Sequence, residues 1–131
     1  MTRRFLTALR PSLAAVLSGL AVALAFPHFD VWWLAWLAYV PLLFVIEEAS
    51  GRRTFLLAWL AGTTANFVGF FWMSGMLYNF GHLPYVVSVA LTLAGAAWQG
   101  ISIALAFWFS LLLSRRSGLR PWLFLPLAYT F

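Results

Sequence analysis

The stretch of sequence that decides the fold runs from Gly69 to Pro84, GFFWMSGMLYNFGHLP. It begins apolar and aromatic and ends in an almost uncharged turn, in which Gly81 can take positive φ and Pro84 cannot continue the preceding helix. Residues 54–78 and 85–113 carry no ionisable group other than one tyrosine each. Each run exceeds the ~20 residues that a helix needs to cross a bilayer. The stretch therefore predicts the outer end of one membrane helix, a turn, and the beginning of the next.

The composition sets the class of protein. Hydrophobic residues make up 64% of the chain and charged residues 8%, against roughly 45–50% and 25% in a soluble domain. The chain has no Cys, which excludes disulfides, thiolate nucleophiles and Cys metal sites. The formal net charge is +5, but the basic residues are all Arg and stand only between apolar runs. We therefore predict an integral membrane protein that does not bind nucleic acid.

The apolar runs predict an all-α, polytopic membrane helix bundle with four full transmembrane helices and the start of a fifth. In the first span Ala15, Gly19 and Ala23 recur every four residues, which would let another helix approach closely. A cleaved signal peptide is the alternative for this segment, but further spans follow at once. The predicted spans are about 11–26, 31–46, 54–79, 85–113 and, in part, 121–131.

Local signals refine these spans. Three tryptophans between residues 32 and 36 are typical of a membrane–water boundary. Pro41 is expected to kink the second span unless a neighbouring helix compensates, and Thr54 is a plausible N-cap for the third. The last segment, 121–131, would extend only ~17 Å as a helix, about half of the hydrocarbon core. On physical grounds we expect the sequence to be cut from a longer protein.

The arginines predict the orientation in the membrane. All eight lie before the first span, between spans two and three, or between spans four and five. The two remaining turns, residues 26–30 (FPHFD) and 79–84 (NFGHLP), contain none. The positive-inside rule then places the N-terminus in the cytoplasm and both of these turns outside.

The two outer turns carry a resemblance to a known family. Residues 26–43, FPHFDVWWLAWLAYVPLL, resemble the opening of the apolipoprotein N-acyltransferase family, which reads F-P-x-F-D/G, then tryptophans, then P-L-L. The family also has a Trp followed, twelve residues later, by the end of an F-G-G-x-P turn. Here Trp72 is followed by Phe80, Gly81 and Pro84 at that spacing.

The sequence departs from the family pattern in two places. The family often has Tyr and Ser where this chain has Ser74 and Met76, and the second glycine of the turn is His82 here. The resemblance covers most of residues 13–131. Its motifs are specific in combination, although each is weak alone.

The resemblance implies a function. Enzymes of this family have eight membrane helices and an extracytoplasmic nitrilase-like domain with a Glu–Lys–Cys triad. They move an acyl chain from a phospholipid to the diacylglyceryl-cysteine of a lipoprotein. This chain has no Cys and no Lys, and Glu47 and Glu48 are predicted on the cytoplasmic side. Residues 1–131 would therefore be the N-terminal transmembrane region of a larger enzyme in the bacterial cytoplasmic (inner) membrane, inactive alone, with no cofactor and its catalytic residues elsewhere.

The resemblance also implies partners: a phospholipid acyl donor, a diacylated lipoprotein acceptor and membrane lipid. The outer turns would then contribute to the lipid-substrate site. For the aromatic residues among them, a simple aromatic belt at the membrane surface is the alternative interpretation. The candidate substrate-binding residues are Phe26, Pro27, Trp72, Tyr78, Phe80, Gly81, His82 and Pro84.

Two further interpretations remain open from the residues. The chain could be a stand-alone multi-span protein, such as a transporter subunit or assembly factor, but spans three and four contain no Asp, Glu or Arg, which transport usually needs. A metal or acid–base site could use His28, Asp30 and His82. Two histidines and one carboxylate on separate turns are weak support, so we predict no metal site.

One side-chain contact inside the bundle is also predicted. Asn66 and Gln99 lie at similar depth on neighbouring antiparallel spans, ~22–26 Å from the turn. Glycines stand near both amides along the sequence. Because an amide in hydrocarbon needs a partner, we expect a direct Asn66–Gln99 hydrogen bond.

Overall fold

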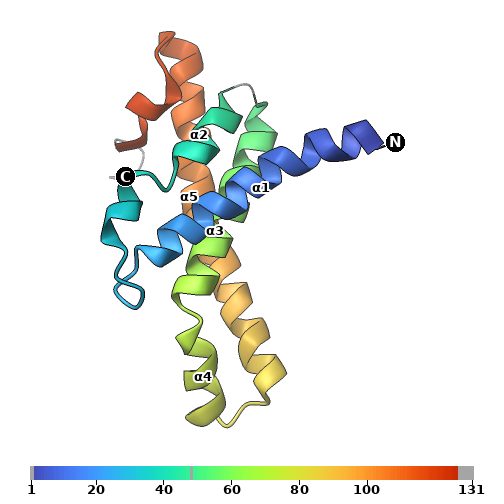
Figure 1. Ribbon diagram of the computed structural model, residues 1–131, viewed down its shortest axis with the longest axis vertical. Helices are drawn as coiled ribbons and strands as arrows, with labels where there is room; N and C mark the ends of the chain where they lie inside the picture. Colours follow the sequence, from blue (N-terminus) through green and yellow to red (C-terminus); the bar gives the residue numbers. More distant parts are fainter. Residues whose placement is uncertain (1, 48, 127–131) are drawn as a thin grey trace.

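The computed structural model describes residues 2–47 and 49–126, and the side chains of residues 10–47, 49–121 and 123–126. These residues form helices and loops without a strand, which confirms the all-α prediction for this part of the chain (Figure 1). The α-helices are α1 (Thr2–Leu24), α2 (Val40–Ile46), α3 (Gly51–Gly69), α4 (Trp72–Asn79) and α5 (Tyr85–Ser117), and the 3-10 helices are η1 (Trp32–Trp36) and η2 (Pro121–Leu123).

Helices α3 and α5 form the central pair of the fold. The helices run antiparallel, and small residues allow close contact: a Cβ atom on Gly62 would lie 3.1 Å from the Cα atom of Gly100. The register is also fixed by a hydrogen bond, in which Nε1 of Trp59 donates to the carbonyl oxygen of Ala97 at 2.9 Å. With 33 residues, α5 is about 50 Å long.

The helix α1 crosses α3 (Figure 1), and the stripe of small residues makes this contact. Ala15, Gly19 and Ala23 are all buried. A Cβ atom on Gly19 would collide with the carbonyl oxygen of Ala61 and lie 2.7 Å from the Cβ atom of Thr64. The prediction that this stripe allows close helix packing is confirmed.

The predicted second span is not a continuous helix. Residues 31–46 instead form η1, a turn and the seven-residue helix α2. Pro41 lies in the first turn of α2, where its missing N–H costs no helical hydrogen bond. The proline therefore starts a helix, and the expected kink was wrong. Another first-turn amide, that of Leu42, donates to the hydroxyl of Ser18 in α1 at 3.1 Å.

The predicted third span is also interrupted. The helices α3 and α4 meet at an angle of 54° across Phe70 and Phe71. The aromatic ring of Phe26 packs at this break, edge to face on Phe70 with ring centroids 5.3 Å apart. The residue that caps α3 is Ser50, whose hydroxyl accepts from the amide of Arg53 at 3.4 Å. The N-cap prediction for Thr54 was therefore wrong: this residue lies inside α3 and is fully buried.

The helices found in the predicted spans differ in whether they are long enough to cross a membrane. Among the described residues, only α5 is long and apolar enough to cross a membrane, and α3 with α4 would be a second crossing if the bent pair is one span. Residues 10–24 and 32–46 form shorter apolar helical segments. Of the predicted partial span 121–131, residues 121–123 form η2, and residues 127–131 lie outside the described part. Four full spans plus a fifth are thus not found as single long helices.

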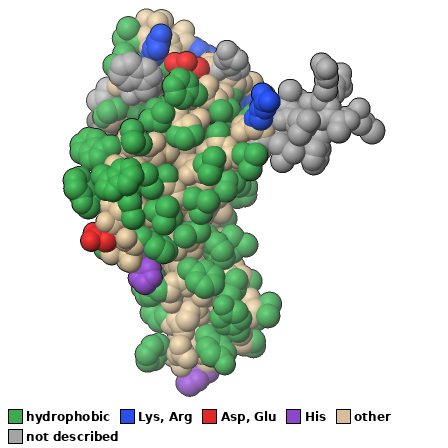
Figure 2. Space-filling model, in the orientation of Figure 1, with side chains coloured by type: hydrophobic (Ala, Val, Ile, Leu, Met, Phe, Trp, Pro, Cys, Tyr) green, Lys and Arg blue, Asp and Glu red, His purple; other side chains and the backbone are tan. Residues whose placement is uncertain are grey.

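The core is small and the outer surface is strongly apolar. Trp36, Phe80 and Trp98 expose 83%, 82% and 76% of their surface, and hydrophobic side chains cover most of the visible face (Figure 2). Such a surface needs an apolar partner, either hydrocarbon or protein. The buried core cluster consists of Ala15, Leu42, Ile46, Leu57, Ala58, Ala61, Ala104 and Phe107.

Candidate functional site

The arginines of two loops, at 52–53 and 115–120, gather at one end of the molecule. The guanidinium of Arg115, near the end of α5, donates to the carbonyl oxygen of Ala49 just before α3, at 3.3 Å. This contact brings the arginines at 52–53 and 115–120 to the same end, towards the top of Figure 2, with the histidines farther down. Gly118, with φ of 71°, ends α5 there. We refer to this end as the arginine end.

Three candidate site residues lie near the break between α3 and α4. Phe26 also packs against the end of α3, since a Cβ atom on Gly69 would lie 3.3 Å from its ring. Pro27 follows in the loop, and Trp72 begins α4 with 60% of its surface exposed. We call Phe26, Pro27 and Trp72 the break surface.

The other candidates form the turn between α4 and α5. Tyr78 contacts Tyr85 edge to face, with ring centroids 6.0 Å apart. Position 81 needs glycine because the backbone packs closely there: a Cβ atom would lie 2.6 Å from the carbonyl oxygen of Leu77. Positive φ, which Gly81 could adopt, is found instead at His82, at 51°. The remaining members of this hairpin tip are Phe80, which is exposed, and Pro84, which caps α5.

The structure does not gather the candidates around one point. The break surface and the hairpin tip are separated by the length of α4, eight residues or about 12 Å. In Figure 1 the loop after α1 accordingly lies well above the turn between α4 and α5. The candidates form two aromatic surfaces along one protruding hairpin.

The chemistry of these surfaces is apolar. Within the described ranges, no three side chains of the types His, Cys, Asp and Glu come close enough to hold a metal ion. His28 contacts the ring of Phe29, with centroids 5.0 Å apart. The two surfaces can therefore bind apolar and aromatic groups.

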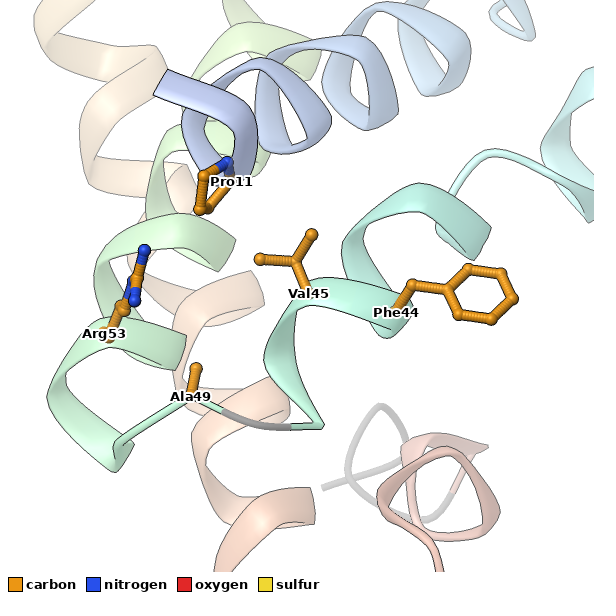
Figure 3. A pocket seen from close by; sticks show the side chains of 5 residues that line it. All are labelled: Pro11, Phe44, Val45, Ala49 and Arg53. Atoms are coloured by element: carbon orange, nitrogen blue, oxygen red, sulfur yellow. The ribbon is translucent and has the colours of Figure 1, made fainter. Parts of the chain in front are cut away.

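Two cavities were not predicted. The first, about 310 Å³, lies at the arginine end between α1, α2 and the beginning of α3 (Figure 3). The second, about 410 Å³, is an apolar groove between α3 and α5 that includes Trp59 and Trp98. Sequence reasoning missed both because each combines residues from separate helices, whose rotation the apolar sequence does not specify. The first cavity is lined by Pro11, Phe44, Val45, Ala49 and Arg53.

The predicted Asn66–Gln99 hydrogen bond is wrong. The amide of Asn66 donates within its own helix, to the carbonyl oxygen of Gly62 at 2.9 Å, and the Gln99 side chain is exposed. The reason is the rotation of α5: Gly100 faces α3, and a helix turns by about 100° per residue. Depth alone was therefore not sufficient to predict the contact.

Comparisons with known proteins agree with the sequence resemblance. Three curated relatives are named apolipoprotein N-acyltransferase. The one from Geobacter metallireducens is 37% identical over 82 residues, covering 63% of this chain and 16% of the relative. The one from Bdellovibrio bacteriovorus is 32% identical, and the match covers 70% of this chain and 17% of the relative. The one from Pasteurella multocida is 33% identical, and the match covers 66% of this chain and 17% of the relative. The chain thus spans about a sixth of the length of these relatives.

No solved structure matches the chain. The family described as "Apolipoprotein N-acyltransferase N-terminal domain" matches residues 18–131, a range that includes the break surface and the hairpin tip. This match covers most of the chain, and the chain therefore belongs to the apolipoprotein N-acyltransferase family.

Proposed function

We propose that this chain is the N-terminal membrane region of an enzyme that transfers an acyl chain from a phospholipid to the diacylglyceryl-cysteine of a lipoprotein. The observation that carries the proposal is the family match over residues 18–131. The chain contains neither Cys nor Lys, so a Glu–Lys–Cys triad would belong to another part of the enzyme. The role of this region is to anchor the enzyme in the bacterial inner membrane and to form part of its lipid-substrate site.

The proposed topology places the arginine end in the cytoplasm, with both aromatic turns outside. Because Gly62 packs on Gly100, the antiparallel register puts Gly69 level with Leu93. From Leu93 to Arg115, α5 covers about 33 Å, close to the ~30 Å of a hydrocarbon core. The break surface then lies at the outer membrane–water boundary, and the hairpin tip extends beyond it.

Reporter fusions test this topology. A reporter that is active only outside the cytoplasm is expected to be active when fused after Asp30 or after Gly81. A fusion after Arg53 should be inactive, because the arginines hold that loop in the cytoplasm. A cytoplasmic signal after Asp30 or Gly81 would overturn the proposed orientation.

The substrate role rests on the exposed aromatic residues of the outer surfaces. Trp72 and Phe80 expose 60% and 82% of their surface, on the side where an extracytoplasmic catalytic domain would sit. Apolar rings at a membrane boundary suit the acyl chains and glycerol of a lipid substrate. The partners proposed for the site are therefore the phospholipid donor and the diacylated lipoprotein.

A chimera tests the substrate role. This chain would replace the corresponding region of the Geobacter metallireducens relative, and acyl transfer to a diacylated lipopeptide would be measured. Trp72→Ala or Phe80→Ala should reduce transfer at limiting phospholipid at least about tenfold, because the loss of one aromatic contact is worth ~1.5–3 kcal/mol. Trp98→Ala, which removes another exposed tryptophan from the middle of α5, is the control. Equal activity of all three variants would contradict the substrate role of Trp72 and Phe80. Acyl transfer by the 131-residue chain alone would contradict the proposal that the catalytic residues belong to another part of the enzyme.

A further inference from the structure

The cavity at the arginine end combines a charge with apolar walls. Arg53, in the first turn of α3, directs its side chain along the cleft towards Pro11 of α1 (Figure 3). Val45 of α2 and Ala49 form the remaining walls of the cleft. Phe44 lies at the edge of the cleft and exposes 75% of its surface. The cleft is therefore amphipathic, with a cation beside an apolar wall.

Among the described residues, none pairs with the charge of Arg53. Its guanidinium makes no hydrogen bond or ion pair with any other residue that the structure describes. Glu47, two residues before Ala49, is exposed and forms no ion pair with Arg53 among the described contacts. The segments that border the cleft contain Arg10, Arg52 and Arg53 against the two carboxylates Glu47 and Glu48, so their formal net charge is +1.

These features define the chemistry of a ligand. A guanidinium presents a planar fork of donors that matches the oxygens of a phosphate. The neighbouring apolar wall suits the glycerol and first methylenes of a lipid. The volume, about 310 Å³, lies at the lower limit of the ~300–1,000 Å³ of ligand pockets, which fits a headgroup and not a whole lipid.

We propose that this cleft binds the headgroup of an anionic phospholipid, with its phosphate on Arg53 and its glycerol against Pro11 and Val45. The charge of the arginine end complements the anionic headgroup, which an uncharged or zwitterionic lipid would not match as well. The site lies at the opposite end from the break surface and the hairpin tip. It thus goes beyond the proposed substrate site and does not require acyl transfer.

Native mass spectrometry of the purified chain in detergent tests the proposal. The chain would be titrated with phosphatidylglycerol and, separately, with phosphatidylcholine. We expect one phosphatidylglycerol to be retained preferentially, and Arg53→Gln to weaken its binding about fivefold, the effect of one arginine on an anionic lipid. Arg53→Lys, which keeps the charge but not the fork, should fall in between.

Arg52→Gln is the matched control, because Arg52 is adjacent and also exposed but does not line the cleft. Equal losses in Arg52→Gln and Arg53→Gln would show general attraction to positive charge and overturn the proposal. Millimolar inorganic phosphate should not displace the lipid, since the apolar wall contributes; full displacement would assign the site to free phosphate and also overturn it.

A second measurement uses the unmodified chain and so does not depend on the folding of a variant. Phosphatidylglycerol with a photoactivatable headgroup would be cross-linked to the chain, and the modified peptides identified. Cross-links in residues 44–53 and around Pro11 are expected. Cross-links confined to other segments would overturn the proposal, whatever the variants show.

Discussion

Substitution of Gly100 by alanine is expected to destabilise the pairing of α3 with α5. The new Cβ atom would lie 2.7 Å from Oγ1 of Thr63, 2.9 Å from the Thr63 amide nitrogen and 3.1 Å from the carbonyl oxygen of Trp59. Two of these are backbone atoms, so relief requires the helices to separate. Overpacking of this kind typically costs about 1–3 kcal/mol, and thermal unfolding in detergent, followed by circular dichroism, should show a clear decrease of the midpoint.

Gly95 provides the matched control in the same helix. No atom lies within 4 Å of a Cβ atom placed there, so Gly95→Ala adds a methyl group into open space. Alanine is the better helix former by up to about 1 kcal/mol, and this variant should be as stable as the original or more so. If Gly100→Ala and Gly95→Ala unfold at the same midpoint, the proposed close contact of α3 with α5 is wrong.

Removal of the Ser18 hydroxyl is expected to loosen α2. The hydroxyl is fully buried and accepts from the amide of Leu42 at 3.1 Å. Pro41 precedes this amide, and the first turn of a helix has no internal acceptors for its N–H groups. Ser18→Ala therefore leaves a buried donor unpaired, at a cost of about 1–3 kcal/mol.

Hydrogen exchange measures this effect at the position itself. The Leu42 amide should exchange faster in Ser18→Ala, and the unfolding midpoint should fall. Ser102→Ala is the control, because the exposed Ser102 hydroxyl donates only to Gln99 of its own helix, at 2.6 Å. An unchanged exchange rate at Leu42 would show that the hydroxyl does not protect this amide.

The sequence predicted the features that depend on composition and local spacing. The all-α class follows from the long apolar runs, and the packing of α1 follows from small residues at Ala15, Gly19 and Ala23. The common end of the arginines at 52–53 and 115–120 follows from their position between apolar runs. Each of these signals is carried by the residue types themselves, so no knowledge of helix rotation or tertiary contact is needed.

The interruptions of the spans were not predictable by the same means. Phe70 and Phe71 are neither Gly nor Pro, and an apolar run continues across them. The break lies where the ring of Phe26, over 40 positions earlier in the chain, packs on Gly69 and Phe70. Such a contact depends on the path of another segment, which local propensity does not report.

The candidate site was predicted as a set of residues and not as an arrangement. The turns were recognised from their aromatic and Gly-Pro patterns, and the family match includes them. Their separation is set by the eight residues of α4, a helix that begins only because the longer apolar run is interrupted at Phe70 and Phe71. The cleft with Arg53 had no local signal, because an arginine after a loop reads only as a topology marker.

The hydrogen bond between Leu42 and Ser18 has a consequence for biosynthesis. The helix α2 has seven residues, about 10 Å, and depends on α1 to satisfy an amide in its first turn. Unpaired backbone groups are strongly disfavoured in hydrocarbon. In the membrane topology that we propose, this segment would therefore enter the lipid together with α1, as one hairpin, and not by itself. A substitution of Ser18 would then impair the membrane insertion of the segment around Leu42, 24 positions later in the chain.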